Sequence, residues 1–349
     1  TFLFRRGNHT QPAEQVQAGE LVVLNQQHPL TIAPNNATLE STGRRLAYAR
    51  HLTSGKHPLV ARVMVNRIWL HHFGRGIVNS VGDFGQLGER PSHPQLLDWL
   101  ADELVRNGWQ LKHLHRLLVT STAFRQSSQR TPQLDEIDPD NRLYARSSIR
   151  RMESEAVRDS VLAVSGQLNQ KMFGPSVPVM EDAVGQIIVG IEFLDGERKP
   201  TKVIPMQGED FRRSVYIQVR RSRPLAVLET FDLATLSPNC AQRNFSNVAP
   251  QALLLMNSQF IVKYSRQFAD RVIREAGDQL AAQLDRAWEL AYGTRPTPEN
   301  NQLLQAFVEN QQRELQQQDS KLDATTARQR ALASACQAIM SANAFIYID

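Results

Sequence analysis

The chain has 349 residues, of which 41% are hydrophobic and 21% are charged. This composition is typical of a soluble globular protein and excludes a disordered or collagen-like chain. No stretch approaches the roughly 18 consecutive apolar residues of a membrane span, so we expect no membrane-spanning segment. No secretory signal is visible after Thr1, although a fragment or a mature form would have lost one.

The net charge of +5 raises the question of nucleic-acid binding. Such an interface needs clustered basic residues, whereas the basic residues here are dispersed and largely offset. Arg151 and Glu155, and Glu155 and Arg158, have the spacing of ion pairs on a helix surface. The sequence therefore does not favour nucleic acid as a partner.

The predicted elements begin with extended segments and loops over 1–37. Helices are then expected from Ser41 or Thr42 to Gly55, from Pro58 to Gly74, over 91–108, from Leu111 onward and over 148–168. Between 173 and 224 glycine and proline recur, and the alternation of Val215, Ile217 and Val219 predicts a half-buried strand. Helical periodicity returns at Pro250, with helices expected over 279–292, 298–318 and 324–342.

These elements predict a mainly α fold, a multi-helical orthogonal bundle with a small β-containing insertion around 173–224. We expect four parts within one continuous globular unit. They are an N-terminal extended segment (1–37), a helical subdomain (38–172), a mixed strand and loop region (173–247) and a C-terminal helical subdomain (248–349).

The most informative sequence is the run 65–78, which mixes asparagine, arginine and two histidines with tryptophan, phenylalanine and glycine. It is followed by Asp83-Phe84-Gly85 and by the helix opening 91–94. A candidate binding surface in this stretch consists of Asn66, Arg67, His71, Asp83 and His93. The alternative is that Arg67 and Asp83 pair to anchor the glycine loop, because buried charges are usually partnered. His72 falls on the apolar face of its helix and is expected to be a core histidine.

Several chemical motifs are incomplete. His71 and His72 are adjacent, so their side chains diverge by about 100° on a helix and do not form a metal-binding pair. Gly74-Arg75-Gly76 lacks the third glycine of a phosphate loop, and Asp138 to Asn141 lacks the glycine and glutamate of a calcium loop, which favours a turn. We therefore predict no metal site and no cofactor within this chain.

Cys240 and Cys336 are the only cysteines. They are too few and too far apart for a paired-cysteine zinc site. They are either two buried thiols or, in an exported protein, one bridge that closes a long loop. No Cys-x-x-Cys-His sequence occurs, which excludes covalent haem in the chain. In the polar run 240–247, Arg243 either belongs to a binding loop or satisfies carbonyls at a helix end.

The run 65–78 with the motifs at 83–85 and 91–94, here called the signature, resembles the planctomycete cytochrome-c-associated domain of unknown function. The similarity rests on 65–76, 83–85, 91–94, 97–100, 114–117, 125–128 and 138–142, and it resumes at 231–232, Cys240, Arg243, Ser246, 251–253, Asn257 and 345–349. A near-final glutamate of the family is replaced here by Ala344, and 173–210 contains no family landmark.

This resemblance implies a domain toward the C-terminus of large exported proteins. It implies a periplasmic or otherwise extracytoplasmic location. It also implies two partners in the same polypeptide, a c-type cytochrome module and a sister domain, so that any c-type haem would belong to another module.

We expect a ligand- or partner-binding module that serves redox or polysaccharide-degrading assemblies, with carbohydrate as a candidate ligand. One alternative is a sugar-active hydrolase or oxidoreductase, which requires Asp83 and a histidine, His71 or His93, to converge in an open pocket. The other is a structural scaffold, which requires Arg67, Asp83 and His93 to be buried and paired. Sugar binding requires an exposed Trp69 or Trp109.

Overall fold

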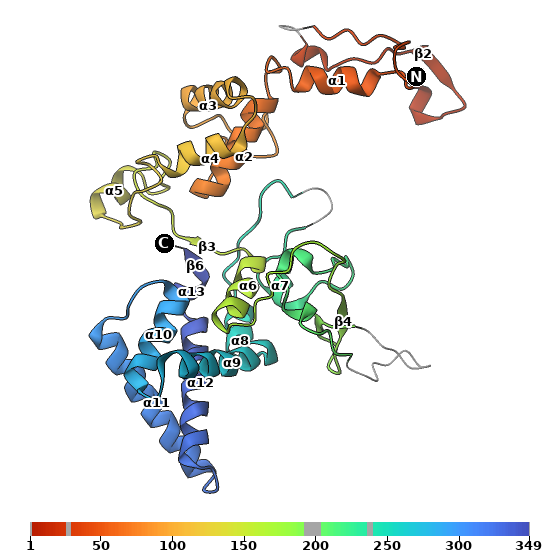
Figure 1. Ribbon diagram of the computed structural model, residues 1–349. Coiled ribbons are helices and arrows are strands. Elements are labelled where there is room, and N and C mark those ends of the chain that lie inside the picture. The colour runs from red at the N-terminus through yellow and green to blue at the C-terminus, as the bar shows by residue number, and fades with distance from the viewer. Residues whose placement is uncertain (1, 26–28, 192–203, 236–239, 349) are drawn as a thin grey trace. The chain divides into compact units, whose positions relative to one another are not determined.

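The computed structural model describes residues 2–25, 29–191, 204–235 and 240–348 (Figure 1). The chain divides into two compact units, here called unit 1 (Thr1–Ser148) and unit 2 (Ile149–Ile348). The boundaries expected at 172/173 and 247/248 do not coincide with this division. Helices dominate the described residues and the strands are few and short, which confirms the expected mainly α fold. None of the described helices combines the length and the apolar character that a membrane crossing requires.

Unit 1 begins with a short antiparallel pair of strands and continues as helices joined by loops (Figure 1). Its strands are β1 (Phe2–Phe4) and β2 (Pro12–Gln15), and its helices are α1 (Arg44–Leu52), α2 (Val60–Phe73), α3 (Pro94–Arg106), α4 (Leu111–Val119) and α5 (Pro132–Ile137). Two 3-10 turns, η1 (Arg5–Gly7) and η2 (Val22–Leu24), lie between β1 and α1.

The core of unit 1 forms where α2 packs against α3 and α4. Trp69 stacks on Phe73 with ring centroids 3.9 Å apart, and Tyr144 packs edge-on against Trp69. Apolar residues three and four apart on α2 and α3 form the buried face that the periodicity predicts. Helix α2 ends at Gly74 as expected, because this residue adopts φ 78° and donates its N–H to the Leu70 carbonyl.

Unit 2 is a helical bundle with two small strand pairs (Figure 1). Its strands are β3 (Arg150–Arg151), β4 (Val179–Glu181), β5 (Ile187–Val189) and β6 (Tyr347–Ile348), with β3 antiparallel to β6 and β4 antiparallel to β5. Its helices are α6 (Ser154–Val164), α7 (Ala226–Thr230), α8 (Ala249–Asn257), α9 (Gln259–Ala276), α10 (Leu280–Tyr292), α11 (Pro298–Gln318), α12 (Ala324–Ser341) and α13 (Asn343–Ile346). The 3-10 turns η3 (Glu209–Phe211) and η4 (Ser214–Tyr216) precede α7.

The C-terminal helices confirm the expected ranges within one residue. Helix α12 packs against α9 and α11, and Phe268 of α9, Leu284 of α10 and Cys336 of α12 are fully buried in the same core. Both cysteines are free thiols, and Cys240 is exposed, so the bridge is not formed and only one thiol is buried. Burial raises the pKa of the Cys336 thiol.

The strand expected over Val215, Ile217 and Val219 is wrong. Ser214 instead begins the turn η4, because its N–H and hydroxyl both donate to Asp159 Oδ1 at 2.7 Å. Val215 and Val219 are exposed, and Ile217 alone of the three is buried. A side-chain bond to the backbone therefore overrides the alternating pattern.

The ion pairs expected on the surface of α6 are also wrong. Arg151 and Arg158 are buried. Arg151 pairs with Asp232 at 2.6 Å, and Arg158 donates to the carbonyls of Asp210 and Arg212. Buried guanidinium groups need such partners. Arg151 thus ties β3, and Arg158 ties α6, to loops distant in sequence.

Candidate functional site

Asn66 is fully buried and ties the glycine reversal to α2. Its Nδ2 donates to the Val78 carbonyl (2.9 Å), and its Oδ1 accepts the Val78 N–H (2.8 Å). A Cβ at Gly76 would lie 2.4 Å from the Val78 oxygen and 3.0 Å from the Asn66 amide. Only glycine fits between these groups. Asn66 is thus buried and binds backbone, and it does not lie on the surface where the sequence predicts a binding residue.

Arg67, His71 and Asp83 are exposed. Asp83 Oδ1 accepts the Gly85 N–H at 2.7 Å, which closes the loop after the reversal. Among the described residues Arg67 and Asp83 form no ion pair, and the scaffold hypothesis required one. Of the three side chains, Asp83 thus has a contact within its own loop.

His93 is half-buried, with Nδ1 3.0 Å from Ser92 Oγ and its ring beside Tyr144. His72 is also half-buried, and its Nδ1 lies 2.7 Å from the Ile68 carbonyl. Trp69 is 5% exposed and Trp109 packs against the same core. The described structure does not place Trp69 or Trp109 as an exposed platform for a sugar.

Arg243 belongs to unit 2 and binds carboxylates rather than helix-end carbonyls. Its Nη1 and Nη2 donate to Glu155 at 2.6 and 3.1 Å, and Nε lies 3.5 Å from Glu153. Burial raises the pKa of Glu155, but the Arg243 hydrogen bonds outweigh it and hold the pKa below the ordinary value. The expected helix-end role is therefore wrong.

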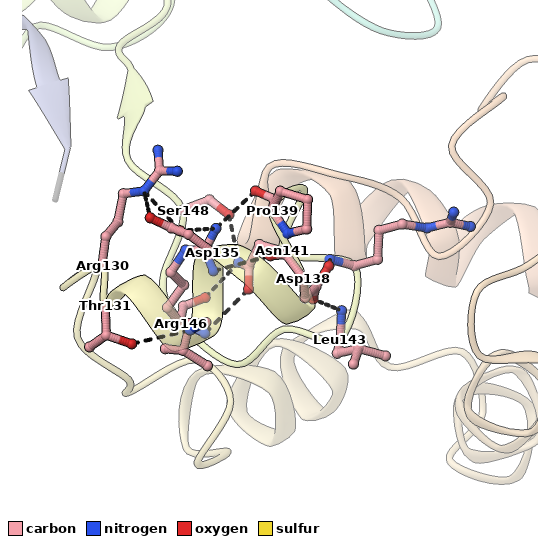
Figure 2. A network of polar contacts seen from close by, with 11 residues as sticks. Arg130, Thr131, Asp135, Asp138, Pro139, Asn141, Leu143, Arg146 and Ser148 are labelled. Atoms are coloured by element: carbon pink, nitrogen blue, oxygen red, sulfur yellow. Dashed lines mark hydrogen bonds and ion pairs between the residues drawn. The ribbon is translucent and has the colours of Figure 1, made fainter.

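The Asp138 turn of unit 1 is a closed polar network (Figure 2). The carboxylate of Asp138 accepts the N–H groups of Arg142 and Leu143 at 2.8 and 2.7 Å. Asn141 donates to the Arg146 carbonyl, and Arg146 donates to the Pro139 carbonyl. Burial raises the Asp138 pKa, yet the two N–H groups prevail and lower it. The carboxylate is occupied by backbone, as a turn requires.

A cleft of about 240 Å³ opens in unit 2, and it is here called the α9 cleft. Its walls come from β5, the start of α7, α8 and the start of α9, and they are largely apolar. The wall residues are Ile187, Ile188, Val189, Leu225, Ala226, Val227, Leu254 and Phe260. Arg158, Asp182, Asp210, Lys263 and Tyr264 add polar groups. A concave apolar surface with a few polar groups is the usual form of a ligand site.

Some charged side chains of the α9 cleft already form hydrogen bonds with the backbone, whereas Lys263 forms none within the part of the chain that the structure describes. Arg158 is held by backbone carbonyls, and Asp182 Oδ1 accepts the N–H groups of Val184 and Gln186. The Lys263 ammonium lies over the rings of Phe211 and Tyr264, at 5.5 and 5.3 Å from their centroids. Lys263 forms no ion pair within the described residues and is exposed. Burial raises the pKa of Tyr264 to about 12.

A second cleft of about 350 Å³ in unit 2 lies beside Glu155 and Arg243. Its walls include Val215, Val219 and Leu233. The charges of this pair neutralise each other, so this cleft offers no uncompensated charge from them.

Glu20, His51 and His57 are the one set of histidine, cysteine, aspartate and glutamate side chains in the described residues whose donor atoms are grouped closely enough to hold a metal ion. One donor atom from each lies within 4.8 Å of the others. The set brings α1 and the turn before α2 together with an upstream loop. The sequence predicts no metal site, so only the structure reveals this candidate set.

Sequence reasoning missed both the α9 cleft and the Glu20 set. The wall residues of the cleft are ordinary apolar residues from four separate segments, and each is also consistent with a core position. His51 and His57 are six residues apart, and Glu20 lies far upstream. A spacing that matches no known ligand motif carries no local signal.

Residues 44–308 match the PSD1 family, described as a protein of unknown function (DUF1553). No curated protein and no solved structure matches the chain. The matched range includes α2 with its glycine reversal and the walls of the α9 cleft, while Glu20 lies before it. Because the match covers most of the 349 residues, the chain belongs to the PSD1 family of proteins of unknown function (DUF1553).

Proposed function

We propose that the chain is a binding module and that its α9 cleft holds a ligand with an apolar body and a negatively charged end. The observation that carries this proposal is the pairing of apolar walls with the exposed ammonium of Lys263. Apolar contact supplies most of the binding free energy of such a site, and a few polar groups orient the ligand. A binding role agrees with the function expected from the sequence, although the surface differs from the one expected.

The ligand is expected to carry a negative charge because of how the ionised side chains of the α9 cleft are already bonded. Asp182 already accepts two backbone N–H groups, and Arg158 adds to the lining a cation that a backbone carbonyl holds in place. Lys263 faces only aromatic rings among the described residues. Asp210 is a further carboxylate of the lining and offsets part of this positive charge. An anion close to Lys263 would gain an ion pair at the edge of an apolar surface, where solvent screens it less than in open water.

Binding is favoured over acid–base or covalent chemistry in this cleft. The described lining residues include no histidine and no cysteine. The Ser258 hydroxyl accepts the Ile261 N–H as the N-cap of α9. The Tyr264 pKa of about 12 keeps its hydroxyl protonated at neutral pH. The lining thus contains no evident nucleophile with an adjacent base.

The test is a fluorescence titration with two probes, anionic anilinonaphthalene sulfonate and neutral N-phenylnaphthylamine. Ala226→Trp fills the cleft and is expected to weaken both probes at least tenfold. The control is Ala306→Trp, because Ala306 is exposed on α11. Lys263→Ala should weaken the anionic probe only, and Arg266→Ala on the same helix should weaken neither. Equal binding of both probes by the wild type and Ala226→Trp would refute the proposal.

We further propose that this module acts outside the cytoplasm, in a longer polypeptide with a c-type cytochrome module and a sister domain. Support comes from the resemblance of the signature over 65–94 to planctomycete cytochrome-associated domains. The module would then serve a redox or polysaccharide-degrading assembly. Fractionation of the source cells, with detection of the full-length protein and haem staining of the same band, tests this. Detection of the protein in the cytoplasm without haem would contradict it.

A further inference from the structure

We infer that Glu20, His51 and His57 of unit 1 form a binding site for a divalent transition metal ion of the zinc class. Glu20 Oε2 lies 3.6 Å from His57 Nε2, and the three donor atoms lie within 4.8 Å of one another. The rings of His51 and His57 meet edge to face, with centroids 5.6 Å apart. This site does not depend on the α9 cleft or on its ligand.

Two of the donor atoms, Glu20 Oε2 and His51 Nε2, are buried and have no hydrogen-bond partner at ordinary distance. The side-chain groups beside the Glu20 carboxylate include the Tyr48 hydroxyl and the His57 ring, whose Nε2 lies 3.6 Å from Oε2. The Glu20 and His57 side chains are only 4% and 5% exposed. Withdrawing a carboxylate oxygen and an imidazole nitrogen from water without a new partner costs free energy. A cation bound between them would satisfy both atoms together.

The donor set selects the class of ion. One carboxylate and two imidazoles suit zinc and its neighbours, whereas magnesium and calcium prefer oxygen ligands alone. Zinc–ligand distances of about 2.1 Å place tetrahedral donors about 3.4 Å apart. The separation of Glu20 and His57 is already close to that value. The remaining donor pairs, which lie within 4.8 Å, need to approach by about 1.4 Å at most.

His57 also caps α2, which determines how it joins the site. Its Nδ1 accepts the N–H groups of Leu59 and Val60 at 3.2 and 3.3 Å. The neutral ring therefore carries its proton on Nε2, facing Glu20. When a metal binds at Nε2, this proton leaves that nitrogen and moves to Nδ1, and the two amide contacts are lost. Metal binding is thus coupled to the environment of the Leu59 and Val60 amides.

The experiment uses the 349-residue chain, stripped of metal with a chelator and titrated with ZnCl2 and, separately, with MgCl2 in a calorimeter. We expect one equivalent of Zn²⁺ to bind with a micromolar or lower Kd and a higher Tm, and Mg²⁺ to have no effect. Glu20→Gln and His51→Ala should each weaken Zn²⁺ binding at least tenfold. His57→Asn should also weaken it while an asparagine keeps the cap. His113→Ala, which removes another histidine paired with a glutamate, should leave the affinity unchanged.

A second measurement does not rely on the variants. Bound Co²⁺ should show the visible absorption of a site with nitrogen and oxygen ligands, and the amide NMR signals of Leu59 and Val60 should shift with one equivalent of Zn²⁺. Absence of Zn²⁺ binding by the wild type overturns the inference. An affinity that survives both Glu20→Gln and His51→Ala, in variants with an unchanged circular dichroism spectrum, overturns it too.

Discussion

The signature region of unit 1 and the α9 cleft of unit 2 use polar residues in opposite ways. In the signature region, Asn66 and Asp83 bind their own backbone, at Val78 and Gly85. In the α9 cleft, the walls are apolar and Lys263 contacts only aromatic rings among the described residues. The region with the more conspicuous sequence is thus the one with the more self-contained structure.

This difference teaches how a polar signature can be misinterpreted. Asparagine, aspartate and glycine hold a tight reversal, because a buried backbone group needs a partner and a close approach needs the absence of a side chain. A ligand site instead needs a concave apolar surface, which any apolar residues can form. A dense polar motif therefore indicates a demanding backbone conformation at least as strongly as it indicates a binding surface.

Among these substitutions, Asn66→Ala should cause the largest loss in the free energy of unfolding. The substitution leaves the Val78 N–H and carbonyl buried without partners, which we expect to cost about 3 kcal/mol in the free energy of unfolding. His71→Ala, on the exposed side of the same helix, should cost less than about 0.5 kcal/mol. Urea unfolding followed by tryptophan fluorescence measures both. Similar values for the two variants would break the contrast between a buried structural residue and an exposed one.

Arg158→Met should have the next largest effect, although Arg158 lines the α9 cleft. The variant leaves the carbonyls of Asp210 and Arg212 without their buried donor, and we expect a loss of about 2 kcal/mol. Denaturant unfolding followed by circular dichroism measures the loss. A variant as stable as the wild type would show that the loop of Asp210 and Arg212 does not depend on this arginine.

Arg243→Ala should cost about 1 kcal/mol at pH 7, since it removes a two-pronged contact with a partly exposed carboxylate. The effect should depend on pH. The pKa of Glu155 is lower when folded, so the unfolded chain binds more protons at acid pH and this stability is lost as the pH falls below about 4.5. Unfolding free energies measured from pH 7 to pH 3 should fall less steeply for Arg243→Ala. Parallel curves would contradict the pairing.

Lys263→Ala should have the smallest effect on stability, less than about 0.5 kcal/mol, because the ammonium is exposed. Thermal unfolding beside Arg266→Ala checks this. A clear loss of stability would mean that Lys263 holds α9 in place through its ring contacts, and the distinction between the self-contained signature and the open cleft would weaken.

The helix boundaries could be predicted from the sequence, whereas the hydrogen-bond and ion-pair partners of the side chains could not. The ranges of α10, α11 and α12 follow from apolar spacing, proline and glycine, all of which act within a few residues. The partners of Arg151, Arg158 and Arg243 did not follow. Arg151 and Arg158 have neighbouring carboxylates in sequence, but their long side chains also reached acceptors that the fold brought close. Arg243 has no carboxylate nearby in sequence, and its partner Glu155 lies 88 residues away along the chain.

The sequence by itself determined the helical class, the end of α2 at Gly74 and, through the motifs of 65–128, a resemblance to a domain of unknown function. These depend on local conformational preference and on residue identity. Only the tertiary structure decided that Asn66 is enclosed, that Val215 and Val219 do not form a strand, and that Glu20 meets His51 and His57. The physical reason is that burial and the grouping of polar atoms are properties of space, which packing between distant segments creates and no local pattern encodes.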